Sequence, residues 1–187
     1  MKLNLKNLEE KPKNKILIIC AILSLVAFLI INSIMSPIES SLKGSTGYGV
    51  LEFELAWNAD TIRTIFNAWG TEGMEKELFV TYIDFLYIIA YSILIFSLNL
   101  LITRQIKGKL KEFGLIISIF PFIAGIFDII ENINLILMLT NEAFIDMGSP
   151  LIASLCASIK FTLLIVAIIY FFIALLNFLI IKIRKKD

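Results

Sequence analysis

The sequence predicts an all-α protein, a bundle of four membrane-spanning helices with a short extracytoplasmic amphipathic helix between the first two. The chain of 187 residues is 58% hydrophobic, and its mean hydropathy of +0.88 exceeds that of an ordinary soluble domain. Four apolar segments each reach the length of about 20 residues that a helix needs to cross a bilayer. Basic residues gather in the segments that would lie on one side. These observations predict a single membrane domain.

The four predicted spans are uneven in charge. Residues 16–35 carry no charged side chain, whereas residues 78–102 contain one acid, residues 113–139 contain two acids and residues 150–181 contain one lysine. The last span is longer than the membrane requires, so we expect it to tilt or to project into the cytoplasm.

The distribution of lysine and arginine predicts the orientation. Cytoplasmic loops carry an excess of these residues, and the two connections predicted to lie outside hold only Lys43, Arg63 and Lys76. We therefore expect a multi-pass protein of the cell membrane with both termini in the cytoplasm. The basic residues that support this orientation are Lys2, Lys6, Lys11, Lys13 and Lys15, then Arg104, Lys107, Lys109 and Lys111, then Lys182, Arg184, Lys185 and Lys186.

The outer segment between the first two spans, residues 36–77, contains two predicted elements. Apolar and acidic residues alternate over residues 50–55, which predicts a short strand or extended stretch. Asn58 or Asp60 then provides an N-cap for a helix, and Gly70 provides its end. The apolar face of this helix consists of Ile62, Ile65, Phe66 and Trp69.

This helix is expected to lie on the outer membrane surface or to cap the bundle. Trp57 and Trp69 suit the membrane interface, where an indole ring keeps one edge in water. The segment either covers the helix ends as a simple lid or gates the access of a substrate.

The second span carries an acid near its outer end. Asp84 lies about 9 Å inside the span at a rise of about 1.5 Å per residue. Tyr87 and Tyr91 follow it by three and seven residues, so all three side chains share one helical face.

The other spans carry polar residues at a similar depth. In the third span, Asp128, Glu131 and Asn132 share one face about 10–17 Å from the outer end, and Lys160 lies about 15 Å inside the fourth. Asn32 lies near the outer end of the first span. A charge near the bilayer centre opposes insertion by about 2.5–3.5 kcal/mol, so we expect these groups to face one another inside the bundle.

The predicted cluster contains more acids than bases. Lys160 neutralises one carboxylate, which leaves two of Asp84, Asp128 and Glu131 uncompensated. We expect at least one of them to be protonated at neutral pH; alternatively, Arg63 folds in from the outer segment, or a bound cation supplies the missing charge. The predicted ligand-binding residues are Asp84, Tyr87, Tyr91, Asp128, Glu131, Asn132 and Lys160.

Several classes of function do not fit the composition. The absence of histidine removes imidazole metal ligands and a serine–histidine nucleophile system. A net charge of +1 gives no basic field for nucleic acid. Glycine-rich phosphate loops are missing. Lys160 would oppose a divalent ion among the acids, so we expect no metal and no cofactor.

The remaining hypotheses come from three classes. The leading one is binding or transport of a small amphiphile or cation by the carboxylate and lysine cluster. A lipid-modifying enzyme is the first alternative, because acids, lysine and tyrosine support acid–base catalysis without histidine. A structural or partner-binding subunit is the second, because buried polar groups also hold membrane helices together. The expected partners are the lipid bilayer and a lipid or small amphiphile, and the oligomeric state stays open.

Three strings of the sequence carry a resemblance: residues 69–73 (WGTEG), residues 82–91 (YIDFLYIIAY) and residues 128–132 (DIIEN). With them, the chain resembles a group of small four-helix prokaryotic membrane proteins with no assigned activity, which implies the topology and the polar cluster. A looser, architectural resemblance is to emopamil-binding and sigma-2-type proteins, which hold ligands through membrane acids. The chain departs from them in having no histidine and no acid in the predicted first span.

Overall fold

The computed structural model describes residues 5–184, and within that range the chain is all-α, without a strand. Lys2, Lys185 and Lys186, which contribute to the predicted orientation, lie outside the described residues. The elements are η1 (Leu5–Glu9), α1 (Asn14–Thr46), α2 (Val50–Glu54), α3 (Ala59–Thr103), α4 (Lys109–Ile117), α5 (Phe120–Thr140), α6 (Ala143–Asp146) and α7 (Ser149–Arg184).

Four helical segments are long and apolar enough to cross a membrane: α1, α3, the pair α4–α5, and α7. The predicted number of spans is therefore confirmed. The third span is broken at Ser118 and Ile119, just before Pro121. Proline fits the first turn of a helix, where its missing N–H leaves no bond unmade.

The first helix is longer than predicted. It continues past residue 35 and through Pro37, and it ends at Gly47, which adopts a left-handed conformation with φ of 81°. Glycine has no Cβ and adopts this conformation without steric cost. As a consequence Glu39 belongs to α1, although residues 16–35, the predicted span, contain no acid.

The extended stretch predicted over residues 50–55 is also wrong, because residues 50–54 form the short helix α2. A strand needs a neighbour for its backbone hydrogen bonds, and the described chain provides none. One helical turn satisfies these groups locally. The Glu52 side chain supports the turn by accepting the Gly49 N–H at 2.8 Å.

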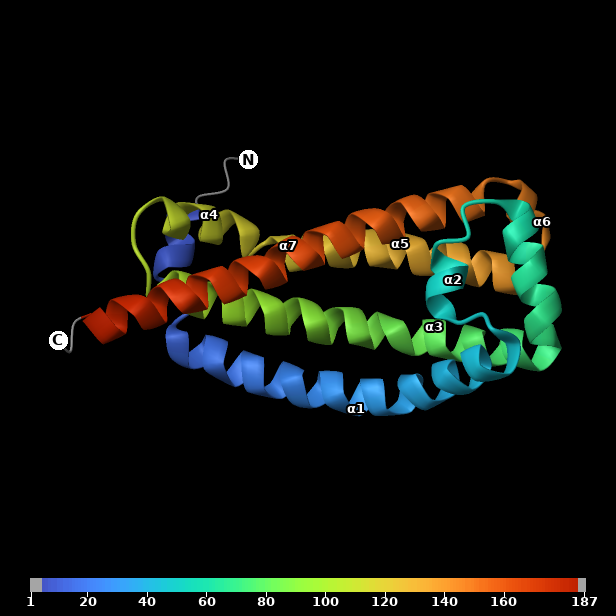
Figure 1. Ribbon diagram of the computed structural model, residues 1–187, viewed down its shortest axis with the longest axis horizontal. Coiled ribbons are helices and arrows are strands. Elements are labelled where there is room, and N and C mark those ends of the chain that lie inside the picture. The colour runs from blue at the N-terminus through green and yellow to red at the C-terminus, as the bar shows by residue number, and fades with distance from the viewer. Residues whose placement is uncertain (1–4, 185–187) are drawn as a thin grey trace.

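The predicted amphipathic helix is confirmed as the first part of α3. Asn58 accepts the Thr61 N–H at 2.9 Å as the N-cap. Gly70, with φ of 61° and ψ of −175°, separates this part from the span that follows. Figure 1 shows residues 59–69 crossing the end of the bundle, so the helix caps the bundle. We call residues 47–69, which include α2, the lid.

The apolar face of the lid packs on the ends of the long helices. Ile62, Ile65, Phe66 and Trp69 are buried together with Leu42 of α1 and with Leu135 and Met138 of α5. The Trp69 indole N–H donates to the Tyr48 carbonyl at 2.9 Å. Trp69 is thus a core residue of the lid, whereas Trp57 is 44% exposed.

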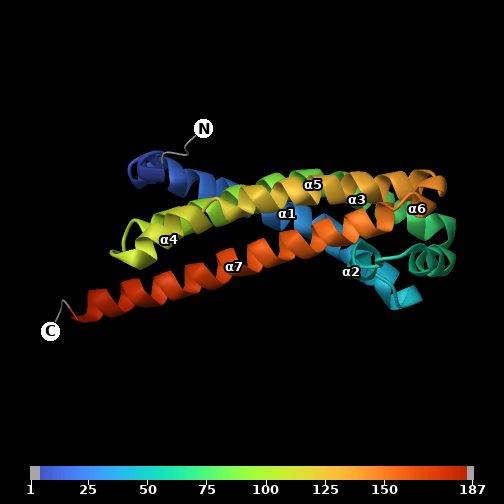
Figure 2. The ribbon, with the colours of Figure 1, turned by 90° about the horizontal axis from the view of Figure 1, so that it is seen from above.

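The long helices form an open bundle. α3 packs against α1, α5 and α7, and α7 packs mainly along α5. The lid and α6 lie at one end, and η1, α4 and the end of α7 lie at the other (Figure 1). Figure 2 shows α7 diverging from the other long helices towards its C-terminal end.

Candidate ligand cavity and buried charge cluster

The buried amine of Lys160 on α7 is the centre of the charge cluster. Its Nζ atom lies 2.9 Å from Asp128 Oδ1 and 2.9 Å from Glu131 Oε1, both on α5, and 3.1 Å from Glu54 Oε1 on α2. Lys160 is 5% exposed. An ammonium group has three N–H donors, and each has a carboxylate partner here.

The predicted contact between the lysine and the membrane acids is therefore present for Asp128 and Glu131. Asp128 also accepts a hydrogen bond from the Tyr91 hydroxyl at 2.8 Å. Asp84 does not contact Lys160; its carboxylate accepts instead from the Asn132 amide at 2.7 Å. The polar residues thus form two hydrogen-bonded groups, one around Lys160 of α7 and one that joins Asp84 of α3 to Asn132 of α5.

Glu54 is a member of this cluster that the sequence analysis missed. It comes from the lid, and its carbonyl oxygen accepts from the Ser154 hydroxyl at 2.7 Å, while Ser154 Oγ accepts the Trp57 N–H at 3.0 Å. These contacts fix α2 on α7 and bring the Glu54 carboxylate to Lys160. Charge removed from water needs a paired, hydrogen-bonded partner, so this ion pair attaches the lid to the bundle.

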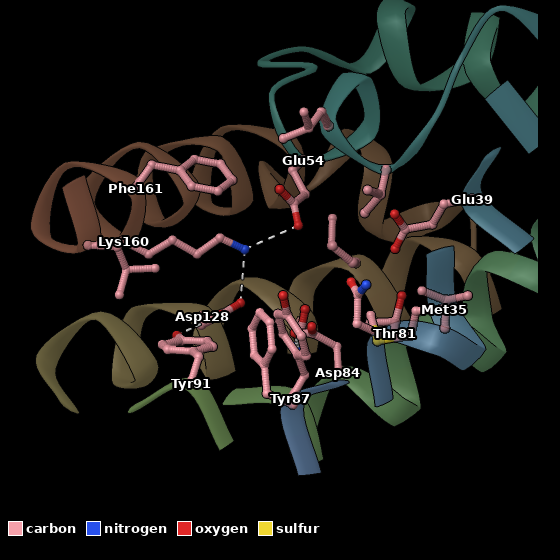
Figure 3. Close-up of a pocket in the computed structure, with 18 of the residues that line it drawn as sticks. Met35, Glu39, Glu54, Thr81, Asp84, Tyr87, Tyr91, Asp128, Lys160 and Phe161 are labelled. Carbon is pink, nitrogen blue, oxygen red and sulfur yellow. Dashed lines mark hydrogen bonds and ion pairs between the residues drawn. The ribbon is translucent and has the colours of Figure 1, made fainter. Parts of the chain in front are cut away.

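A cavity of about 390 Å³ lies beside the cluster. Its volume falls in the usual range of small-molecule sites, about 300–1,000 Å³. Side chains from α1, α2, α3, α5 and α7 line it, and Figure 3 shows the side chains of Lys160, Glu54 and Glu39 extending towards its centre. Of the predicted ligand-binding residues, those that line the cavity are Asp84, Tyr87, Tyr91, Asp128, Asn132 and Lys160.

Glu131 is the one predicted site residue that does not line the cavity. It is 0% exposed, its Oε1 atom binds Lys160, and its Oε2 atom has no hydrogen-bond partner. Glu131 therefore does not line the cavity itself, but it forms an ion pair with Lys160, which does.

Two further acids that the sequence analysis did not single out line the cavity, Glu39 of α1 and Glu77 of α3. Glu77 is 0% exposed, and neither of its carboxyl oxygens has a hydrogen-bond partner. The spacing contained a signal for Glu77, which precedes Asp84 by two helical turns and therefore shares its face. Glu77 was overlooked because it comes just before the apolar segment. Glu39 was overlooked because α1 was expected to end at residue 35.

The lining of the cavity is strongly acidic. The amine of Lys160 is the only basic group among the lining residues. Arg63 does not fold in, because its guanidinium pairs with Asp146 at 2.7 Å on the surface, which contradicts that alternative. The carboxyl groups that line the cavity are those of Glu39, Glu54, Glu77, Asp84 and Asp128.

The remaining walls are aromatic and aliphatic. The rings of Phe28 and Tyr87 stack with centroids 4.7 Å apart, and Tyr87 meets Tyr91 edge-on at 5.9 Å. Phe161 lies beside Lys160, whose Nζ atom is 4.9 Å from the ring centroid. Aromatic rings attract cations through their faces.

The cavity extends to the side of the bundle between α1 and α7. Asn32 of α1 and Ile168 of α7 both line it and both remain exposed, Ile168 by 43%. Side chains of α3 and α5 line the cavity on the side away from this opening, and α2 covers it at the lid end. In a membrane this side faces the acyl chains, since the exposed surfaces of α1 and α7 consist of large aliphatic side chains.

Among the described residues, no group of three or more acids and cysteines has the geometry to hold a metal ion. The two cysteines, Cys20 and Cys156, are free. Three acids converge on the Lys160 amine, and the others line the cavity away from it.

The fold and the site together define a class: a four-helix bundle of membrane-spanning length, with a capped, acidic and aromatic cavity that reaches its apolar side. Comparison of the chain with protein families, with curated proteins and with solved structures finds no match.

Proposed function

We propose that this protein is an integral membrane protein that binds a small amphiphile in the cavity between α1 and α7. The observation that carries the proposal is the form of the cavity, which has polar groups at its inner end and an apolar opening towards the acyl chains. An amphiphile matches both parts, because its head group reaches the buried polar groups while its tail stays in contact with apolar side chains.

The charge balance favours a ligand over a purely structural role. Helix packing requires that buried charges be paired, and Lys160 contacts Glu54, Asp128 and Glu131 but supplies one positive charge for the three carboxyl groups. Glu77, Glu39 and Asp84 add further carboxyl groups around an open volume without adding a second base. Asp84 contributes to packing through its hydrogen bond with Asn132, whereas the carboxyl oxygens of Glu77 have no partner. A carboxyl group without a partner beside an open volume is the kind of arrangement that a bound cation or bound protons would complete.

The distribution of basic residues supports an orientation with the lid outside the cell and both termini in the cytoplasm. η1 and the end of α7 lie together at the end opposite the lid, as this orientation requires. It is tested with single cysteines placed at Ser45 and at Lys107 in a chain whose Cys20 and Cys156 are serine. A membrane-impermeant maleimide added to intact cells should label position 45 and not position 107, and the reverse pattern would overturn the orientation.

The proposed binding is tested by blocking the opening of the cavity. Ile168→Trp places a large ring at the mouth, whereas Ile169→Trp places it on an exposed surface of α7 that does not line the cavity. The thermal unfolding of both variants and of the native chain is measured in lipid nanodiscs with dodecylamine, dodecanol and dodecanoate as probes. A bound ligand raises stability by about 2.7 kcal/mol at a hundred times its Kd.

At least one probe should raise the unfolding temperature of the native chain and of Ile169→Trp, with a shift that is lost in Ile168→Trp. If all three proteins respond alike to every probe, the effect comes from the surrounding lipid and the proposed cavity function is wrong.

One observation favours a second candidate, a structural subunit. Lys160 connects α2, α5 and α7 through its three carboxylate contacts. The cluster therefore holds these helices together with or without a ligand in the cavity. This candidate predicts that no probe distinguishes Ile168→Trp from Ile169→Trp.

A further inference from the structure

The cationic donor of the cavity is already used, and this bears on which head group fits. The three N–H groups of Lys160 donate to Glu54, Asp128 and Glu131. The Tyr91 hydroxyl donates to Asp128, and the Thr81 hydroxyl donates to the Glu77 carbonyl at 2.8 Å. An anionic head group would find only the neutral donors of Tyr87 and Asn32 without a partner, and it would lie among five carboxyl groups with no basic side chain except the already paired Lys160.

The acceptors, in contrast, are in excess, and Glu77 is the clearest case. Both of its carboxyl oxygens are buried without a partner while the residue lines the cavity. A buried acceptor left unpaired costs about 1–3 kcal/mol, and a hydrogen-bond donor bound in the cavity removes that cost.

Three further acids, Glu39, Glu54 and Asp84, line the same cavity as Glu77. Figure 3 shows Glu39, Thr81 and Met35 together at one end of the cavity, on the side away from Lys160 and Phe161. This end therefore combines carboxyl groups with apolar side chains, and the only basic lining residue, Lys160, lies at the other end.

We infer that the ligand is an amphiphile with a positively charged amine, whose ammonium group binds Glu77 and Glu39 at the lid end of the cavity while its chain leaves between α1 and α7. The inference rests on the proposed function, because it specifies the head group of an amphiphile that the cavity binds. A metal ion does not fit as well, since the acids form no set of three metal ligands among the described residues. The aromatic rings of Phe28 and Tyr87 add walls that suit an organic cation.

The three single-chain probes that differ only in head group test this inference. Dodecylamine is a cation at neutral pH, dodecanol is neutral and dodecanoate is an anion, so differences in affinity report the head group and not the chain. Binding is measured in nanodiscs for the native chain, for Glu77→Gln and for Glu75→Gln. Glu75 is an exposed acid two residues away on α3, and its substitution removes the same charge outside the cavity.

The native chain and Glu75→Gln should bind dodecylamine at least about tenfold more tightly than dodecanol, which corresponds to about 1.4 kcal/mol. Glu77→Gln should lose this preference while its affinity for dodecanol stays unchanged, which also shows that the variant is folded. A Glu39→Gln variant should lose part of the preference.

The remaining outcomes distinguish two failures. If dodecylamine and dodecanol bind equally and Ile168→Trp blocks both, the cavity binds amphiphiles but the inferred amine is wrong. The same holds if dodecanoate binds most tightly, or if Glu77→Gln keeps the preference for the amine. If none of the probes binds the native chain, both the inference and the proposed function fail.

Discussion

The two ends of the bundle use polar side chains in different ways. At the end that contains η1 and α4, polar side chains form hydrogen bonds with backbone carbonyl groups. Tyr170 forms a hydrogen bond with Thr103 at 2.9 Å and donates to the Leu110 carbonyl at 3.2 Å. The Arg104 guanidinium donates to the carbonyl oxygens of Leu8 and Pro12. At the lid end, acids surround a cavity and one of them, Glu77, has no partner at all.

The partnerless atoms at the two ends also differ in kind. Near the C-terminal end of α3, Ser97 Oγ and Asn99 Oδ1 are buried without partners, but they belong to neutral groups that do not line the cavity. The partnerless atoms of Glu77 belong to an acid beside an open volume. Only the lid end therefore combines unmet polar chemistry with space for a ligand. The comparison indicates packing at one end and binding at the other.

The largest effect should come from the centre of the charge cluster. Lys160→Met leaves three buried carboxylates without their partner, and breaking a buried ion pair by removing one member costs about 3–5 kcal/mol. Titration with sodium dodecyl sulfate, followed by the loss of helical circular dichroism, measures the change. Lys182→Met, on an exposed part of the same helix, should change the free energy of unfolding by no more than about 0.5 kcal/mol. Equal effects of the two substitutions would show that the buried contacts contribute no stability.

At the opposite end the sensitive position is a glycine. A Cβ atom on Gly114 would overlap the Tyr170 hydroxyl and approach Thr103 Oγ1 to 2.5 Å. Gly114→Ala should therefore destabilise the bundle by about 1–3 kcal/mol and leave probe binding at the lid end intact. Gly44→Ala is the control, since nothing lies within 4 Å of its Cβ position. A loss of probe binding by folded Gly114→Ala would contradict the separation of the two ends.

Glu77 should behave in the opposite way to Lys160. Glu77→Met removes a buried carboxyl group without a partner and should raise the unfolding free energy of the ligand-free protein by about 1–3 kcal/mol. Glu75→Met, on the exposed face of α3, should change it much less. The same titration checks both variants. If Glu77→Met destabilises the protein as strongly as Lys160→Met, then Glu77 is a packing residue and the comparison fails.

The smallest effect concerns the edge of the lid. The Lys43 ammonium donates to Glu52 Oε1 at 2.6 Å and holds the pKa of the Glu52 carboxyl group below its ordinary value. A lowered pKa in the folded state stabilises the fold above the pKa of the unfolded chain, and this contribution disappears as the pH falls through the folded pKa. The pair is largely exposed, so its contribution is about 0.5 kcal/mol.

Measurements of unfolding between neutral and acidic pH check this effect. Glu52→Gln should flatten the loss of stability at acidic pH by that amount, and Glu10→Gln, an exposed acid outside the lid, should not. A steeper loss in Glu52→Gln would reverse the sign and contradict the assigned contact.

Much of the fold follows from the sequence because a membrane imposes simple requirements. A run of apolar residues of sufficient length forms a spanning helix, so the four spans were predictable. The contacts of Lys160 with Asp128 and Glu131 were predictable from the cost of exposing charge to lipid. The capping helix followed from Asn58 and Gly70, since side-chain capping and positive φ are local properties.

The rest depends on contacts that are distant in the sequence. Glu54 reaches Lys160 only because the Ser154 contacts hold α2 against α7, and its alternating neighbours favoured an extended stretch. Whether α1 stops at residue 35 or continues to Thr46 is decided by packing of its last turns on the lid, where Leu42 is buried. The position of Glu39 in the cavity follows from that continuation and could not be predicted without it.

The central claim is that an amphiphilic amine enters the cavity from the side of the bundle. Photolabelling with an analogue of dodecylamine that carries a diazirine in its chain tests it most directly, with labelled residues located by mass spectrometry. The account predicts label on the residues that line the mouth, above all Asn32 and Ile168, and loss of this label when excess dodecylamine competes. Label spread evenly over lipid-facing residues such as Leu23 and Ile173, without competition, would contradict it.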